Sequence, residues 1–428
     1  SRSIHSHFRA RTYLNNFLIT FHVFFFCRMI RFLVFLVFVS FGGVLSEKDI
    51  GRRRVVPVIH VVGSHYDVGF DVGRNFEGVI KEFLATFASL RDFEKQYKTE
   101  AGREAYEKTL SNMLERYPYY VKEVQGIADG AKVPFHQLFL LHMDDIIDTV
   151  NDNQIVRNDT GGCSSVAINT PQANVLGHTE DALSETLNHF YILSAHIIPT
   201  LEDQQKGAVE ERFASLCYAG QLPGYTSGFN EHGMVFSINT LSPKALKPGG
   251  TPRTFITRAM LAAKSVEEVE RVLTDKGLGI GNGFSLNLFW TNPTGPRQLF
   301  NIEVAPELKA DRSQINIQKY EMNGDALVHC NKYQRLNLTE VRGPIIDSSV
   351  ARLSMIHGHA KPTSKGDVEN IISDISGKEF RVFEDRKTAQ VKTICAGIFD
   401  LDQRSWSLYI NQPNSSEPVA TIPIVFTF

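Results

Sequence analysis

The spacing of hydrophobic positions changes twice along the chain and divides it into three parts. A nearly continuous apolar stretch lies within residues 17–46, and helical spacing dominates from about residue 65 to residue 150. After residue 163, short runs with strand character alternate irregularly with helical blocks, and no internal repeat is visible. Because strands and helices come in blocks and not in strict alternation, the pattern alone predicts an α+β fold.

The first globular part is predicted to be mostly helical. Residues 55–62 read as a strand, and Gly63 turns the chain into a helix that continues past residue 83. Residues 102–150 are predicted to be largely helical, because their apolar positions fall on one helical face. His65 is interpreted as a capping or packing residue in preference to an active-site group. Residues 47–162 are interpreted as a pro-region, or small chain, that stays packed on the rest.

The second globular part is predicted to supply most of the strands. Ser265 and Glu268 form a capping-box pattern at the start of one of its helices. Helices are expected at 252–263, 265–276, 348–357 and 367–376, and strands at 163–170, 174–177, 191–199, 211–220, 225–233, 234–240, 284–290, 297–304, 326–331, 394–401 and 406–411.

The apolar N-terminal stretch has the form of a targeting segment. Met29 and Arg31 precede an apolar run that ends in small residues before Glu47, which is typical of a secretory signal peptide. We expect residues 29–46 to be that signal peptide, with an uncleaved membrane anchor as the alternative. Residues 1–28 are interpreted as untranslated upstream sequence or an incomplete gene model.

Composition narrows the class of protein. The chain has 428 residues, of which 43% are hydrophobic and 21% are charged, so it can bury a sizeable core. A net charge of −2 gives no basis for nucleic-acid binding. No cofactor motif is present, and the glycine-rich run at 279–283 lacks the spacing of a phosphate loop. Whether the chain forms a homo-oligomer is left open.

Cysteine and asparagine positions agree with export. Past the leader the chain has too few cysteines for a disulfide scaffold, and their spacing fits no zinc motif, so no pairing is deduced and no metal is expected. These cysteines are Cys163, Cys217, Cys330 and Cys395. Three triplets have the form of glycosylation acceptors, at Asn158, Asn337 and Asn414.

The candidate chemistry centres on Gly162 and Cys163. A cysteine that follows two glycines and directly precedes a strand has its sulfur at the strand end, where a substrate can reach it. If its thiol attacks the preceding carbonyl, the chain cuts itself, and the new N-terminus carries both a nucleophile and an amine base. A thiol with a pKa of about 8.5 and an α-amine with a pKa of about 7.7–8.0 are well matched for proton transfer. The alternative is a structural cysteine after a Gly-Gly turn.

The residues around Cys163 carry a family resemblance. Gly162-Cys-Ser-Ser, followed by Gly177-His-Thr-Glu-Asp-Ala-Leu, resembles the acyl-coenzyme A:6-aminopenicillanate acyltransferase family of N-terminal-nucleophile hydrolases. Within that family, the second run is similar to that of hydrolases of N-β-alanyl-dopamine. The resemblance extends from about Val55 to the C-terminus. It implies a four-layer αββα sandwich and a catalytic chain of residues 163–428 that stays associated with the fragment preceding the cut.

The resemblance also implies site residues. Asp181 is expected to hold the new Cys163 ammonium, and Asn331 to be the oxyanion donor, with Asn239 as a second donor position. Arg352 matches the family's later arginine, with a surface helix position as the alternative. Related bile-salt hydrolases carry arginine where this chain has His178, so His178 is expected to act, if at all, as a substitute in substrate binding.

Three functions are compatible with these residues. The first is an amidase that hydrolyses an N-acylated biogenic amine through a thioester, and the second is an acyltransferase of the same fold. The third is a catalytically silent secreted binding protein. For an N-β-alanyl substrate, Glu180 is the candidate partner of the ammonium, because a buried ammonium needs a counter-charge. Tyr225, Phe229 and Phe284 are candidates to line the amine side. A papain-like site is disfavoured because the local Cys motif of that family is absent.

Overall fold

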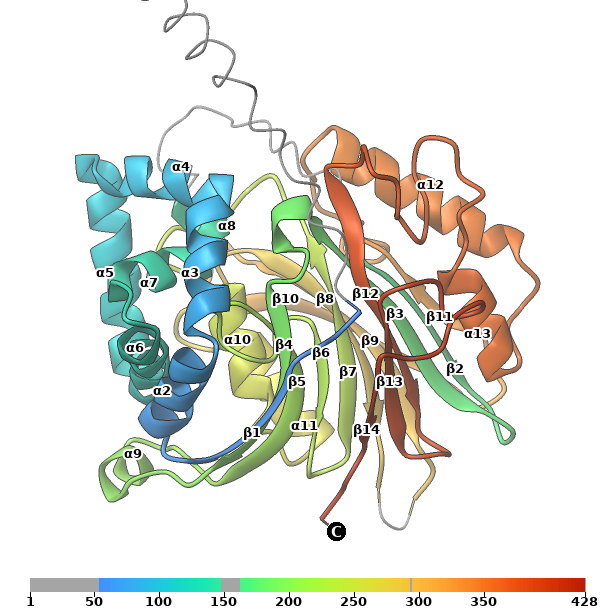
Figure 1. Cartoon of the computed structure of the whole chain (residues 1–428), viewed down its shortest axis with the longest axis horizontal. Helices are drawn as coiled ribbons and strands as arrows, with labels where there is room; N and C mark the ends of the chain where they lie inside the picture. Colours follow the sequence, from blue (N-terminus) through green and yellow to red (C-terminus); the bar gives the residue numbers. More distant parts are fainter. Residues whose placement is uncertain (1–53, 148–161, 293–294, 428) are drawn as a thin grey trace, which may run out of the picture. The chain divides into compact units, whose positions relative to one another are not determined.

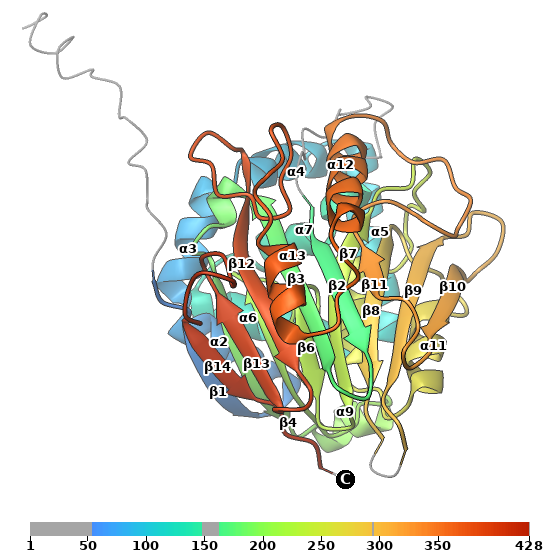
Figure 2. The same ribbon diagram turned by 90° about the vertical axis from the view of Figure 1, so that its right-hand side faces the viewer.

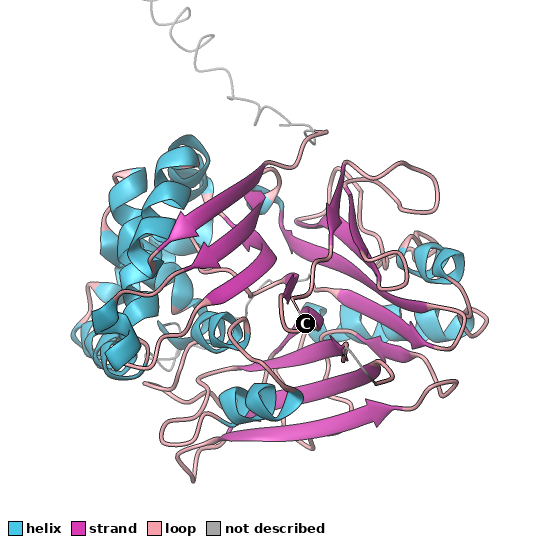
Figure 3. Ribbon diagram, turned by 90° about the horizontal axis from the view of Figure 1, so that it is seen from below, coloured by secondary structure: helices cyan, strands magenta, loops and turns pink. Residues whose placement is uncertain are grey.

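A computed structural model describes residues 54–147, 162–292 and 295–427 of the chain. Two β-sheets lie face to face, and helices cover the outer face of each (Figures 1 and 2). Seen from below, the strands occupy the middle and the helices lie at the outer sides (Figure 3). This arrangement confirms the predicted α+β class and the αββα sandwich.

Most of the helical layer against the larger sheet comes from the first globular part. Strand β1 (Val58–Gly63) leads into helix α2 (His65–Asn75), which Ser64 and Asp67 begin with a reciprocal capping box. The following helices are α3 (Glu77–Thr86), α4 (Ala88–Tyr97), α5 (Glu100–Arg116), α6 (Pro118–Ala131), α7 (Phe135–His142) and α8 (Asp144–Ile147).

Helices α2 and α6 pack unusually close together because glycines line their contact. A Cβ atom added at Gly69 would lie 2.1 Å from the Glu123 carbonyl oxygen, and one at Gly126 would lie 2.3 Å from that of Tyr66. Side chains at these positions would force the helices apart, so the glycines permit the backbone contact. The close pair fixes the buried face that α2 and α6 present to the sheet.

The larger sheet has eight strands in the order β1-β4-β5-β6-β7-β8-β9-β10. Only the β1–β4 pair is parallel among its described pairs, and the others are antiparallel. Its other strands are β4 (Phe190–Ile197), β5 (Glu211–Tyr218), β6 (Ser227–Asn230), β7 (Met234–Leu241), β8 (Gly283–Trp290), β9 (Gln298–Pro306) and β10 (Ser313–Tyr320).

The smaller sheet has six strands in the order β11-β2-β3-β12-β13-β14, all antiparallel. These are β2 (Ser164–Asn169), β3 (Asn174–Leu183), β11 (Leu327–His329), β12 (Val391–Asp400), β13 (Ser405–Tyr409) and β14 (Ala420–Pro423). The remaining helices are the 3₁₀ turn η2 (Ser184–Thr186), α9 (Leu201–Gln205), α10 (Arg253–Met260), α11 (Val266–Thr274), α12 (Pro344–Gly358) and α13 (Lys365–Ile372).

Three apolar cores separate the four layers. One joins the N-terminal helices, α10 and α11 to the larger sheet, and includes Phe83, Phe139 and Phe284. A second fills the space between the sheets around Trp406. A third joins α12 and α13 to the outer face of the smaller sheet. Strands β7, β8 and β9 therefore have both faces covered, which is why polar side chains on their inner face are buried.

The sequence pattern located most elements but missed several features, among them α9 and η2. Strand β3 continues to Leu183, so His178, Glu180 and Asp181 lie within a strand and not in a loop after it. Strands β10 and β14 were not predicted, because β10 is largely solvated and β14 is short. As predicted, Ser265 caps α11 by accepting the Glu268 backbone N–H.

The predicted signal peptide and the residues 148–161 before the predicted cleavage site lie outside the described residues. Residues 1–46 and Asn158 belong to the parts of the chain that the structure does not describe, so the signal peptide, the start at Met29 and that glycosylation triplet stay predictions. Within the described ranges, no helix is both long and apolar enough to cross a membrane.

Candidate active site around Cys163

Cys163 stands immediately before β2, in the space between the two sheets. The residue is 4% exposed. Its carbonyl oxygen accepts one hydrogen bond from Asn239 Nδ2 at 2.9 Å and one from Arg352 Nη1 at 2.8 Å. These donors come from β7 and α12, so each sheet system contributes one anchor to the same backbone group. The backbone of Cys163 is thereby fixed at the entrance of β2.

Gly162 is closely packed by the same machinery. Its φ of +156° is far from the usual range of L-residues, and a Cβ atom at this position would lie 2.0 Å from Asn331 Oδ1 and 2.9 Å from Arg352 Nη2. Only glycine fits here without displacing Asn331. The sequence prediction that a Cβ at residue 162 would be excluded agrees with this packing.

Arg352 is buried, so the alternative of a surface helix position is wrong. The residue is 1% exposed. Besides the Cys163 carbonyl, its guanidinium donates to Ser164 Oγ at 2.9 Å, to Asn331 Oδ1 at 2.9 Å and to Ser348 Oγ at 3.1 Å. Its bonds to Cys163, Ser164 and Asn331 hold the region around the Gly162–Cys163 peptide, while the bond to Ser348 lies within α12.

Asn331 and Asn239 differ in what they contact. Asn331 lies just after β11 and donates through Nδ2 to the backbone oxygen of Thr240 at 2.9 Å and to its Oγ1 at 3.2 Å. Its oxygen accepts from Arg352, so its amide faces the site with the oxygen in the uncut chain. Asn239, which the sequence ranked second, is the amide that donates directly to Cys163.

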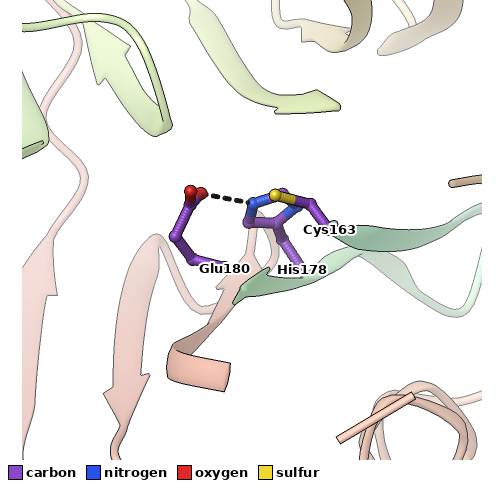
Figure 4. A group of neighbouring side chains, drawn as sticks. All are labelled: Cys163, His178 and Glu180. Atoms are coloured by element: carbon purple, nitrogen blue, oxygen red, sulfur yellow. Dashed lines mark hydrogen bonds and ion pairs between the residues drawn. The ribbon is translucent and has the colours of Figure 1, made fainter. Parts of the chain in front are cut away.

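His178 and Glu180 lie next to the Cys163 thiol and are bonded to each other (Figure 4). His178 Nε2 lies 2.9 Å from Glu180 Oε2, and His178 Nδ1 lies 2.9 Å from Ser165 Oγ. The Tyr218 hydroxyl donates to the other carboxylate oxygen of Glu180. His178 is 1% exposed and Glu180 is 6% exposed. Both ring nitrogens of His178 are therefore engaged within the protein, which does not suit a direct substitute for a substrate-binding arginine.

The site disfavours a charged thiol and a fully ionised Asp181 in the uncut chain. Burial raises the pKa of the Cys163 thiol well above its usual range, and Glu180 and Asp181 raise it further, against Arg352. Burial also raises the pKa of Asp181 from 3.8 to about 7, although Arg352 and a hydrogen bond from Thr393 Oγ1 at 2.6 Å oppose the rise. In both groups burial disfavours the charged form, and the nearby carboxylates disfavour the thiolate further.

A cavity of about 170 Å³ opens beside this centre. Its wall brings together the predicted residues Gly162, Asp181 and Arg352 with a segment that the sequence analysis left unassigned. That segment contributes Glu379, Phe380, Arg381, Glu384, Arg386, Ala389, Gln390 and Val391. Gly162, the residue directly before Cys163, therefore borders this cavity.

Among the described residues, one group has ligand atoms close enough to hold a metal ion. Cys163, His178 and Glu180 each offer one atom within 4.8 Å of the others. Binding an ion there would require breaking the His178–Glu180 hydrogen bond, since both ring nitrogens already have partners. The geometry therefore suits a hydrogen-bonded polar cluster better than a metal centre.

Other predicted residues lie away from Cys163. His65 is in a buried charge cluster beneath the larger sheet, with its Nδ1 2.9 Å from Glu123 and with Arg258 bonded to both Glu123 and Glu211. This supports the packing interpretation of His65.

Of the aromatic candidates, Tyr225 lies near Tyr218, the residue that bonds Glu180. Its ring centre is 6.4 Å from that of Tyr218. Phe284 is buried under the helices and Phe229 packs edge-on against Trp406, so both belong to cores. The side chains of Asn337 and Asn414 are exposed, as glycosylation would require.

Several polar residues that hydrogen-bond to the site residues were not predicted from the sequence. Ser165 Oγ contacts Asn239 Oδ1 at 3.0 Å and Ser237 Oγ at 3.1 Å, and Tyr218 holds Glu180. The available signal was the alternation in β7 and β8, where Ser and Asn recur at every second position among large apolar residues. On a strand covered on both faces, such positions are buried and need partners.

Comparison with known proteins agrees with this geometry. Residues 168–415 match the model of the family described as acyl-coenzyme A:6-aminopenicillanic acid acyl-transferase. A β-alanyl-dopamine/carcinine hydrolase of Drosophila melanogaster is 41% identical over 387 residues, which cover 89% of this chain and 99% of that protein. The 40 kDa form of an acyl-coenzyme A:6-aminopenicillanic-acid-acyltransferase of Emericella nidulans is 24% identical over 227 residues, covering 52% of this chain and 58% of that protein.

These similarities confirm the predicted resemblance and the prediction of an enzyme. The family model covers more than half of the chain, and the Drosophila relative is similar along nearly all of its own length. The described chain also has the layered architecture that the resemblance implied. The chain belongs to the acyl-coenzyme A:6-aminopenicillanic acid acyl-transferase family.

Proposed function

We propose that the protein is a self-cleaving amidase that uses Cys163 as an N-terminal nucleophile. It hydrolyses the amide of an N-acylated biogenic amine, with N-β-alanyl amines as the preferred class, through a thioester on Cys163. The observation that carries the proposal is the double anchoring of the Cys163 carbonyl by Asn239 and Arg352, directly after a closely packed Gly162. A cysteine with only a structural role has no need of a buried guanidinium on its backbone.

Self-cleavage begins with attack of Cys163 Sγ on the Gly162 carbonyl carbon. The thiol proton passes to a base, the S–C bond forms, and the C–N bond breaks as the proton is delivered to the departing Cys163 nitrogen. Asp181 lines the same cavity as Gly162 and has a pKa of about 7, so near neutral pH a fraction of it is able to accept the proton. Water then hydrolyses the thioester, which releases the Gly162 carboxylate and frees the thiol of a Cys163 whose α-amine was freed when the C–N bond broke.

The freed amine supplies the base for the second reaction. It takes the thiol proton while Sγ attacks the substrate carbonyl, and it returns that proton to the leaving amine as the thioester forms. Water activated by the same amine then releases the acid. Asp181, whose buried carboxylate would gain a counter-charge from the new α-amine, is the proposed partner of the Cys163 ammonium. Asn331 and Asn239 are the candidate oxyanion donors, and Asn331 must turn its amide once the Gly162 peptide leaves.

The substrate class is inferred from the relative and from one carboxylate. The Drosophila relative is named for β-alanyl-dopamine and carcinine, and that preference is proposed for this chain. Glu180 lies within 4.8 Å of the Cys163 sulfur and accepts from the Tyr218 hydroxyl, a neutral donor. A carboxylate has about four acceptor sites, so Glu180 retains capacity for the ammonium of a β-alanyl group. Tyr225, next to Tyr218, is proposed to contact the aromatic amine.

Hydrolysis is favoured over acyl transfer. The relative that is similar over nearly its full length is a hydrolase, whereas the acyltransferase matches about half of this chain at lower identity. A comparison of N-β-alanyl-dopamine, its N-acetyl analogue and a penicillin side-chain amide tests the substrate class. We expect the β-alanyl compound to react fastest and to give free β-alanine. Equal rates on all three would contradict recognition of the ammonium.

Export through residues 29–46 is proposed as well. It is supported by the leader pattern and by the exposed triplets at Asn337 and Asn414. Expression of the full chain in insect cells, followed by deglycosylation, tests it. A mobility shift of protein recovered from medium or lumen is expected, and an unglycosylated protein confined to the cytosol would contradict it.

A further inference from the structure

A line of buried amides crosses the inner face of the larger sheet and ends on Cys163. Arg335 Nη2 donates to Asn301 Oδ1, and Asn301 Nδ2 donates to Asn287 Oδ1 at 2.8 Å. Asn287 Nδ2 donates to Asn239 Oδ1 at 2.7 Å, and Asn239 Nδ2 donates to the Cys163 carbonyl at 2.9 Å. We call these four side chains, Arg335, Asn301, Asn287 and Asn239, the amide relay.

The strand register builds the amide relay. Asn239, Asn287 and Asn301 lie on the neighbouring strands β7, β8 and β9, and Asn287 pairs directly with Asn301. Apolar neighbours at the alternate positions, such as Leu286 and Ile302, face the helices, so all three asparagines face the smaller sheet. All three are at most 1% exposed. Buried amides at adjoining positions must bond one another, because water is excluded.

The direction of every bond in the amide relay is fixed from its far end. A guanidinium can only donate, so Arg335 requires the oxygen of Asn301 to face it. The nitrogen of Asn301 then faces the oxygen of Asn287. The nitrogen of Asn287 in turn faces the oxygen of Asn239. Ser165 Oγ, 3.0 Å away, makes a second contact to the Asn239 oxygen. Asn239 is thus left with one orientation, in which its N–H points at Cys163.

Arg335 is itself held in place by a buried carboxylate. Glu303 accepts the backbone N–H groups of Gln334 at 2.6 Å, Arg335 at 3.0 Å and Leu336 at 2.8 Å. Burial alone would raise the pKa of Glu303, but hydrogen bonds from His329 and from this backbone outweigh burial and lower it to about 2. The turn that carries Arg335 is therefore held by three backbone hydrogen bonds to a carboxylate that stays ionised at neutral pH.

We propose that Arg335, Asn301 and Asn287 are positioning residues for the reaction of Cys163, acting through Asn239. The inference rests on the proposed function. The cation at one end and the head-to-tail amides polarise one another, which strengthens the last donor in the line. The same chain prevents the Asn239 amide from rotating. Loss of any link lets Asn239 turn its oxygen toward the Cys163 carbonyl, and the backbone of the nucleophile loses one of its two anchors.

Isosteric substitutions break single links with little change in volume. In Asn287→Asp the carboxylate cannot donate to Asn239. In Asn301→Asp the contact with Arg335 becomes an ion pair, but the donor to Asn287 is lost. Tyr333→Phe is the matched control, because it removes one buried hydrogen bond in the same region, from the Tyr333 hydroxyl to the Val304 carbonyl at 3.0 Å.

Kinetics of the full-length protein give the first test. Removing an oxyanion donor outright costs about 10²–10³ in kcat, so weakening one through the relay should slow self-cleavage and lower kcat by about tenfold in Asn287→Asp. KM should change by less than about twofold, because no relay member lines the cavity. Arg335→Lys, which keeps a cation, should retain more activity than Arg335→Met. If Asn287→Asp matches Tyr333→Phe in rate, the inference is wrong.

A crystal structure of Asn287→Asp in the Cys163→Ala background gives a test that needs no activity. We expect Asn239 Nδ2 to leave the carbonyl of residue 163, and an unchanged contact at 2.9 Å would overturn the inference. The kinetic test and the crystallographic test also separate the proposed function from the inference about the amide relay. A wild-type protein that neither cuts itself nor hydrolyses amides defeats the proposed function, while the orientation of Asn239 still decides the relay.

Discussion

The elevated pKa of Asp181 predicts a specific dependence of stability on pH in the uncut protein. If Cys163 performs the cut as proposed, Cys163→Ala keeps the chain uncut, so Asp181 has no ammonium beside it. Its pKa is about 7 in this state, against an ordinary value of 3.8 for this carboxyl, and burial is the main cause. A folded state whose acid has a raised pKa binds more protons than the unfolded state, so its stability falls as the pH rises between these two values.

The size of the effect follows from the linkage relation. At pH 5 the unfolded carboxyl is mostly ionised and the folded one protonated, and at pH 8 both are ionised. One pKa unit corresponds to about 1.36 kcal/mol of unfolding free energy. Between pH 5 and pH 8 the unfolding free energy falls by about two such units. Because Asp181 is only partly buried and solvent screens part of the cost, we expect a loss of roughly 2 kcal/mol in the unfolding free energy over this range.

Urea unfolding measures this loss directly. The Cys163→Ala protein is compared with a Cys163→Ala/Asp181→Asn protein at pH 5, 6, 7 and 8, with tryptophan fluorescence and circular dichroism as two probes. The difference in unfolding free energy between the two proteins should grow by roughly 2 kcal/mol in favour of the double variant as the pH rises. Parallel pH profiles would refute the claim that the uncut site disfavours the Asp181 carboxylate.

Three further predictions concern the residues around Gly162. Gly162→Ala should slow self-cleavage at least about tenfold, because the new Cβ meets Asn331. Gly358→Ala is the control and should not slow it, because its Cβ would lie in open space. A time course on denaturing gels measures both rates. Arg352→Met should leave several buried acceptors unpaired, lower stability by about 1–3 kcal/mol and stop cleavage, as followed by urea unfolding and gels. Glu180→Gln should lower kcat/KM for N-β-alanyl-dopamine by about tenfold or more and leave the N-acetyl analogue within about twofold, and equal losses on both substrates would exclude ammonium recognition.

Local pattern placed most helices and strands, whereas the four-layer sandwich was implied by the family resemblance and not by the pattern. The end of β3 was missed, since His178, Glu180 and Asp181 look like a polar loop when their burial is not known. Their burial comes from a tertiary contact, the pairing of β3 with β12. A sequence pattern contains no information about which strand will lie beside another.

The site residues show the same division. Gly162 and Cys163 were found because glycine before a strand-opening cysteine has a local chemical meaning. Arg352 was identified by resemblance, but its burial was not, because its helix reads as partly solvated and its contacts with Cys163 span 189 positions. The hydrogen bonds between Asn239 and the other members of the amide relay depend on the register of three strands. A sequence pattern does not specify that register.

The central claim, that the chain cuts itself before Cys163, is tested most directly by intact-mass measurement and N-terminal sequencing of the purified protein. The account predicts two associated fragments, the larger beginning Cys163-Ser-Ser-Val, and a single inactive chain for Cys163→Ala. A wild-type protein that hydrolyses amides at full rate as one uncut chain would contradict it.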